Sequence, residues 1–298
     1  MNPHADTRPR REQETNSTAL LRVVLFAILM LLVIEMSPVI AGIFYGTELY
    51  DLVGTALFFV TFGLIYFIVL MFIRWEGGSS VSELGLEIDD ADAFPHLLIG
   101  AVAGTAAAVF VVLFAFFLGG SLRPGGQITE DLILSEIVIS VPTAIFEELA
   151  YRGYLTTRMV NLWGMKGGIL VSSVIFGLLH FEWWTPLGTV APLLIVLFTT
   201  NMIIGGVLLS LAYYWSGKKL WMPIGFHFMW NMIAYILFPI YPQEPVYLPE
   251  VFQIEWGLTT VFGFLFGLTV IWLLTDQIRK KKIVGLGQTQ PPTRFYCW

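Results

Sequence analysis

Long apolar runs constrain this chain more than any other feature of its sequence. Eight stretches are long and apolar enough to span a bilayer, namely 20–45, 52–73, 94–118, 132–154, 167–181, 187–215, 220–240 and 256–275. A spanning helix needs about 20 mainly apolar residues. The composition agrees, because 56% of the residues are hydrophobic and only 13% are charged, unlike a soluble domain. The sequence therefore predicts an all-α polytopic membrane protein of about eight helices.

The basic residues predict the orientation of these helices. With eight spans, both termini lie on one side of the membrane and the loops alternate. If that side is the cytoplasm, 15 of the 16 lysines and arginines face it, and only Arg123 lies outside. Cytoplasmic loops carry such an excess of positive charge. We therefore expect both termini to be cytoplasmic.

The chain divides into four parts. Residues 1–18 have the composition of a disordered cytoplasmic tail, 19–131 hold the first three helices, 132–240 hold four core helices, and 256–298 hold the last helix and a basic tail. The acidic insertion 76–92 is expected to be a short surface segment. The single cysteine, Cys297, excludes an intrachain disulfide and a cysteine-based metal site. Two small-residue motifs predict close helix contacts: Gly100-x-x-x-Gly104 and Gly263-x-x-x-Gly267.

Polar residues at membrane depth are few, and each is a functional hypothesis because its burial in hydrocarbon is costly. They are Glu35, Glu136, Glu147, Glu148, Arg152, His180, Asn201, His227 and Asn231. Glu35 and Glu136 have no assigned role at this stage, and Asn201 is expected to serve helix packing.

The spacing of the remaining six residues predicts one site. Glu148 and Arg152 are one turn apart on the same helix face and can pair, whereas Glu147 is rotated by about 100° from Glu148. His227 and Asn231 also share a face, one turn apart. Counting residues from the ends of the spans brings these groups and His180 to one level. We expect them to meet in a pocket that opens towards the cytoplasm.

Such a set of side chains suits hydrolysis of a peptide bond without a serine or cysteine nucleophile. A buried glutamate can act as general base on water, and imidazole and amide groups can donate to the developing oxyanion. A metal is the alternative way to activate the water. His180, His227 and Glu147 make a plausible Zn2+ ligand set, although the sequence holds no His-Glu-x-x-His motif.

Three motifs in order resemble the CPBP family (CAAX protease and bacteriocin-processing, or Abi domain), which includes the Rce1-type prenyl-protein endopeptidases. The motifs are Glu147-Glu148-x-x-x-Arg152, Phe176-x-x-x-His180 and His227-x-x-x-Asn231, and the resemblance covers about 132–240. It implies an intramembrane endopeptidase that cleaves near the C-terminus of a prenylated CaaX protein or within a small peptide. It also implies a prokaryotic plasma membrane protein whose site is reached from the cytoplasm.

The resemblance assigns roles by position. Glu147 would be the general base, assisted by His180. The oxyanion would be bound by His227 and Asn231. The first-named groups would be supported by Glu148 and Arg152. The expected partners are a peptide or prenylated protein substrate and the lipid bilayer, with no nucleic acid. A non-catalytic immunity or scaffold protein on the same fold stays an alternative. A proton-coupled transporter is a weaker one, because the chain lacks the repeats with paired broken helices that this class shows.

Overall fold

The computed structural model describes residues 16–87, 89–180, 190–241 and 244–285, with side chains described as far as residue 277. Within these ranges all regular structure is helical. The longer helices are α1 (Asn16–Gly42), α2 (Tyr50–Trp75), α3 (Ala93–Leu118), α4 (Glu130–Glu148), α5 (Thr157–Leu179), α6 (Pro192–Trp215), α7 (Trp221–Leu237) and α9 (Leu258–Gly285). The shorter ones are η1 (Val81–Leu84), η2 (Gly125–Gln127), η3 (Leu149–Thr156) and α8 (Pro249–Phe252).

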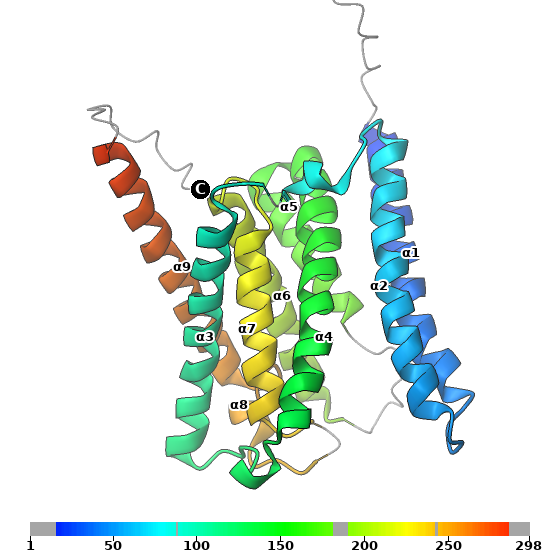
Figure 1. Cartoon of the computed structure of the whole chain (residues 1–298), viewed down its shortest axis with the longest axis vertical. Helices are drawn as coiled ribbons and strands as arrows, with labels where there is room; N and C mark the ends of the chain where they lie inside the picture. The colour runs from blue at the N-terminus through cyan, green and yellow to red at the C-terminus, as the bar shows by residue number, and fades with distance from the viewer. Residues whose placement is uncertain (1–15, 88, 181–189, 242–243, 286–298) are drawn as a thin grey trace, which may run out of the picture.

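Six helical stretches of the described chain are long and apolar enough to cross a membrane, which confirms the predicted multi-pass helical architecture. The count of eight and the orientation stay predictions. The predicted spans 132–154 and 167–181 both lie within Glu130–Leu179, and a non-helical turn at Gly164 (φ 71°, ψ 175°) separates them. The predicted span 220–240 corresponds to α7, which has only 17 residues. The described start of α1 and end of α9 lie at the same end of the molecule (Figure 1).

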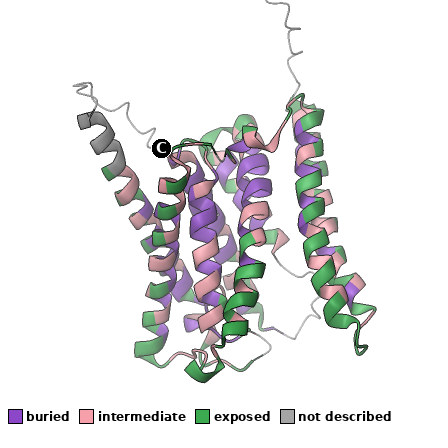
Figure 2. Ribbon diagram, viewed as in Figure 1, coloured by how far each residue is buried: buried purple, intermediate pink, exposed green. Residues whose placement is uncertain are grey.

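The helices pack into two neighbouring hydrophobic clusters. One joins α1 and α2 to α4, η3 and α5, and the other joins α3, α7 and α9 to α6 and α8. In Figure 1, α1 and α2 form a pair on one flank of the bundle. Buried residues line the inner faces of the helices, and exposed residues cover the outside (Figure 2). Many exposed residues are large and apolar, such as Ile43, Phe94 and Phe117, as expected for a surface that faces lipid.

Helices α3 and α7 approach each other closely enough for their backbones to touch. A Cβ atom added at Gly100 would lie 1.9 Å from the Met222 carbonyl oxygen, and one at Gly104 would lie 2.4 Å from the Phe226 carbonyl oxygen. A Cβ at Gly225, on the facing helix, would lie 2.2 Å from a backbone oxygen of α3. These contacts confirm the predicted close approach at Gly100-x-x-x-Gly104 and fix the helix that carries His227.

The second glycine motif also lies at a helix contact. A Cβ atom at Gly263 would lie 2.7 Å from the Val111 side chain, and one at Gly267 would lie 2.8 Å from the Ala107 Cβ. Small residues therefore bring α9 against α3, as the motif predicts.

Arg123, the one basic residue that the predicted orientation places outside, has a structural role. Its guanidinium donates to the backbone carbonyls of Tyr235, Ile236 and Phe238, at the C-terminus of α7. A cation is favourable there because the last carbonyls of a helix have no intrahelical partner and carry partial negative charge. The exception to the charge pattern thus has a local physical reason.

The insertion 76–92 is more than the surface segment expected from its sequence. Leu84 is only 3% exposed and belongs to the first hydrophobic cluster. The Glu76 carboxylate accepts hydrogen bonds from the Tyr154 hydroxyl and the Arg158 guanidinium. The segment lies at the surface as expected, and its buried Leu84 attaches it to the first hydrophobic cluster.

Helix α4 continues into a π-helical segment, η3, and all eight residues of this segment are buried. Single π-helical turns inside α-helices are rare and frequent at functional sites. Here the segment begins directly after Glu147 and Glu148 and contains Arg152, so it sets the geometry of the first motif.

Candidate active site

Glu148 joins two of the predicted motifs. One oxygen, Oε1, accepts from the Arg152 guanidinium at 2.9 Å and lies 2.8 Å from His227 Nδ1. Glu148 is fully buried and Arg152 is 1% exposed. An ionised carboxylate can only accept hydrogen bonds, so His227 carries a proton on Nδ1. The predicted Glu148–Arg152 pair is confirmed, and it also holds the imidazole of α7 in place.

Phe176 explains the second motif. The Arg152 guanidinium carbon, Cζ, lies 4.1 Å from the centroid of the Phe176 ring. The centroids of the Phe176 and His180 rings are also 4.1 Å apart. The Phe176 carbonyl oxygen lies 2.7 Å from His180 Nδ1. Because a carbonyl oxygen only accepts, this hydrogen bond places a proton on Nδ1 of His180 and leaves Nε2 to face the cavity.

Glu147 faces His180. Its Oε2 atom lies 3.5 Å from His180 Nε2, and the two side chains are 19% and 23% exposed. This separation is longer than a direct hydrogen bond and suits a shared proton or an intervening water. Glu147 therefore points away from the Glu148–Arg152 pair, as its helical rotation predicts.

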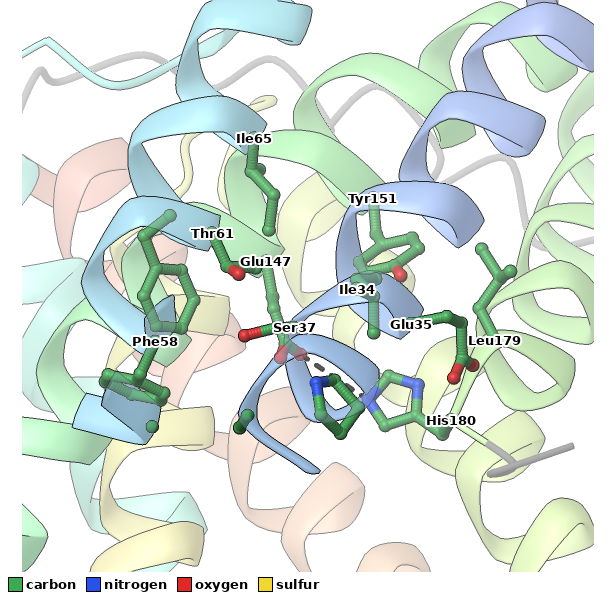
Figure 3. Close-up of a pocket in the computed structure, with 14 residues that line it drawn as sticks. Ile34, Glu35, Ser37, Phe58, Thr61, Ile65, Glu147, Tyr151, Leu179 and His180 are labelled. Atoms are coloured by element: carbon green, nitrogen blue, oxygen red, sulfur yellow. Dashed lines mark ion pairs between the residues drawn. The ribbon is translucent and has the colours of Figure 1, made fainter. Parts of the chain in front are cut away.

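Glu147 and His180 lie between two cavities. The first, of about 420 Å³, is mostly apolar and lies against α1 and α2, with Ile34, Phe58 and Ile65 among its walls (Figure 3). The second, of about 260 Å³, is bounded by α6, α7 and α9. Both cavities are lined by Glu147 and His180. If a peptide bond lay beside this pair, the residues before and after the bond would lie in different cavities.

His227 and Asn231 both line the second cavity, so the structure brings the third motif to the same place as Glu147 and His180. Asn231 is only 5% exposed. Within the described part of the chain its amide has no hydrogen-bond partner. A buried amide normally finds a partner, so this group is available to a ligand in the cavity.

Glu255 is a site residue that the sequence did not reveal. The predicted spans 220–240 and 256–275 leave it in the loop between them, on the outer side, yet it lines the second cavity together with Glu147, His180 and His227. Its backbone is left-handed, with φ 68°. The Asn201 amide donates to its carbonyl at 2.8 Å, and the Thr260 hydroxyl accepts from its N–H at 2.8 Å. Asn201 therefore does more than the packing expected of it, since it holds this turn against the cavity.

Two further polar residues line the first cavity. Glu35 of α1 is 7% exposed and lines the same cavity as His180 (Figure 3). Tyr151 is 2% exposed, and its hydroxyl has no partner among the described residues. The sequence analysis identified Glu35 as a polar residue at membrane depth without assigning it a role, and it did not identify Tyr151. Glu136 is half-buried in α4 and lines neither cavity.

The alternative of a zinc site depends on whether His180, His227 and Glu147 converge on one point. No three histidine, cysteine or carboxylate side chains in the described part of the chain are grouped as metal ligands. Metal dependence therefore stays a prediction for experiment.

Residues 129–233 match the family model described as type II CAAX prenyl endopeptidase, Rce1-like. This segment is an Rce1-like domain. The predicted resemblance is thereby confirmed, with bounds close to the expected 132–240. A search of curated proteins finds no match to the chain. The match covers residues 129–233 of the 298-residue chain, and the family that it describes is one of prenyl endopeptidases.

The Rce1-like domain covers only part of the site. It includes all three motifs, from Glu147 on α4 to Asn231 on α7. Glu35, on α1, and Glu255, before α9, lie outside the matched residues. The acidic residues that add to the motif set therefore come from the flanking segments of this chain: Glu35 from a helix and Glu255 from a turn.

Proposed function

We propose that this protein is an intramembrane endopeptidase that hydrolyses a peptide bond by glutamate-activated water. The observation that carries the proposal is the position of the Glu147–His180 pair, separated by 3.5 Å and lining both cavities. A carboxylate with an adjacent imidazole is a suitable acid–base pair for water attack. The Rce1-like domain supports the same reaction class.

The first step is attack of water on the scissile carbonyl carbon. Glu147 takes a proton from the water as the oxygen–carbon bond forms, and His180 stabilises the proton held between them. When the carbon–nitrogen bond breaks, this proton passes to the leaving amide nitrogen. The second water proton stays on the new carboxylic acid until it ionises, so the overall change is hydrolysis.

The developing oxyanion needs donors in a site that excludes water. The Asn231 amide and Nε2 of His227 line the cavity where that oxygen would lie. Because Nδ1 of His227 already donates to Glu148, donation from Nε2 requires the doubly protonated imidazolium. The buried Glu148 and Arg152 would serve as positioning residues that hold this ring.

The first cavity supports an apolar substrate group next to the scissile bond. Its walls include Phe58, Phe62 and Leu179, and it adjoins Glu147. A prenyl chain or another apolar segment would bury its surface there. We propose a prenylated CaaX protein or a small membrane-associated peptide as substrate. The enzyme would have eight spans, with its termini and the access to its site on the cytoplasmic side of a prokaryotic plasma membrane.

The test is cleavage of a farnesylated CaaX peptide and its unprenylated twin by the purified protein in proteoliposomes. Glu147→Gln and His180→Ala should each lower kcat at least about a hundredfold. Glu136→Gln, in the same helix but lining neither cavity, should cleave like the wild type. A chelator lane tests the metal. If folded wild-type protein cuts neither peptide, this substrate class is wrong; if Glu147→Gln keeps the cellular phenotype, a scaffold role replaces the peptidase.

A further inference from the structure

The second cavity differs in character from the first. Its walls are rich in aromatic rings, and the described residues that line it include no lysine or arginine. The rings are those of Phe176, Phe198, Phe226, Trp230, Tyr235 and Phe264. With a volume of about 260 Å³, it is smaller than the sites that hold drug-sized ligands. Its size suits one amino-acid side chain.

The charges in this cavity do not cancel during the proposed reaction. Glu147 lies against His180, and Glu148 is paired with Arg152. The imidazolium of His227 would be matched by the oxyanion. Glu255 also lines the cavity; it forms no ion pair with a described residue, and its side chain hydrogen-bonds Trp230.

The fold holds Glu255 in this position at a cost. A left-handed backbone at a residue other than glycine costs about 1–3 kcal/mol and persists only where the surroundings enforce it. Asn201 and Thr260 supply that enforcement through the hydrogen bonds described above. The Trp230 side chain hydrogen-bonds the carboxylate, and Trp230 and Phe264, with ring centroids 4.4 Å apart, line the same cavity, where an aromatic face would favour a cation.

We propose that the second cavity is a specificity subsite for a positively charged side chain of the substrate, a lysine or arginine close to the scissile bond, and that Glu255 selects it. The free Asn231 amide independently marks this cavity as a place for a ligand. The subsite rests on the proposed peptidase function. It adds a preference that the Rce1-like motifs do not encode, because Glu255 lies outside the matched residues.

The test compares farnesylated peptides that differ at one position. A lysine is moved through the positions flanking the scissile bond, and each peptide is paired with one carrying norleucine, which has the same length without the charge. At one position the wild type should favour lysine by at least about tenfold in kcat/KM. Glu255→Gln should bring that ratio close to one, and Glu255→Lys should favour a glutamate peptide instead. Glu250→Gln, a nearby carboxylate that lines neither cavity, should keep the wild-type ratio.

A binding measurement separates this proposal from the peptidase itself. Glu147→Gln protein, which should not cleave, is titrated with the lysine and norleucine peptides, and binding is measured by calorimetry. Tighter binding of the lysine peptide that disappears on adding Glu255→Gln supports the subsite even if no cleavage is found. Equal binding and equal cleavage of the two peptides by the wild type would overturn it, whatever the activity of the variants.

Discussion

Gly104→Ala tests whether the α3–α7 contact positions the active site. The new Cβ would lie 2.4 Å from the Phe226 carbonyl oxygen, about 1 Å short of ordinary van der Waals contact, and backbone on both sides prevents easy relief. The helices must therefore separate by about 1 Å at the residue next to His227. Overpacking of this kind costs about 1–3 kcal/mol. A displacement of about 1 Å in a catalytic group can cost about a hundredfold in rate.

The matched control is Gly63→Ala on α2, where an added Cβ meets nothing within 4 Å. Alanine forms helix better than glycine by about 1 kcal/mol, so this variant should be as stable as the wild type or more so. Both proteins are assayed for thermal unfolding in detergent and for initial cleavage rate. If Gly104→Ala matches Gly63→Ala in both measurements, the contact does not position His227 and the reasoning is refuted.

Three other substitutions test the network around the site. Arg152→Met leaves Glu148 without its main counter-ion and should cost about 3–5 kcal/mol of unfolding free energy; a double variant with Glu148→Met should recover part of the loss, and no recovery would contradict a buried ion pair. Asn201→Ala removes two hydrogen bonds to the turn before α9 and should lower stability by about 1–3 kcal/mol, whereas an unchanged melting temperature would count against that role. The pKa of Asp90 is lowered by the Asp92 backbone N–H and by Lys219. The stability that ionised Asp90 adds to the folded state is therefore present above about pH 4 and is lost as the pH falls through the lowered pKa. The melting temperatures of the wild type and Asp90→Asn should converge on acidification from pH 7 to pH 3, and a constant difference would argue against this linkage.

Much of the active site could be predicted from helix geometry alone. The Glu148–Arg152 pair follows from a spacing of four residues, and the separate direction of Glu147 follows from a rotation of about 100°. The grouping of His227 with Asn231 has the same origin. These predictions depend only on local periodicity within helices, which the apolar runs already fix.

Glu255 could not be predicted in this way. Its direction depends on a left-handed turn held by Asn201 and Thr260. Asn201 lies on another helix, 54 residues earlier in the chain, and no local pattern encodes that contact. The sequence offered only an acidic residue before Trp256, which is typical of a loop at a membrane surface.

The π-helical segment has a consequence for how this site can change. Relative to an α-helix, such a segment holds one extra residue, and the removal of one residue turns everything that follows by about 100°. The pairing of Glu147 on α4 with His180 at the end of α5 therefore depends on the number of residues in η3 as well as on their identity. A chain with one residue fewer in η3 could keep every motif residue and still direct His180 away from Glu147.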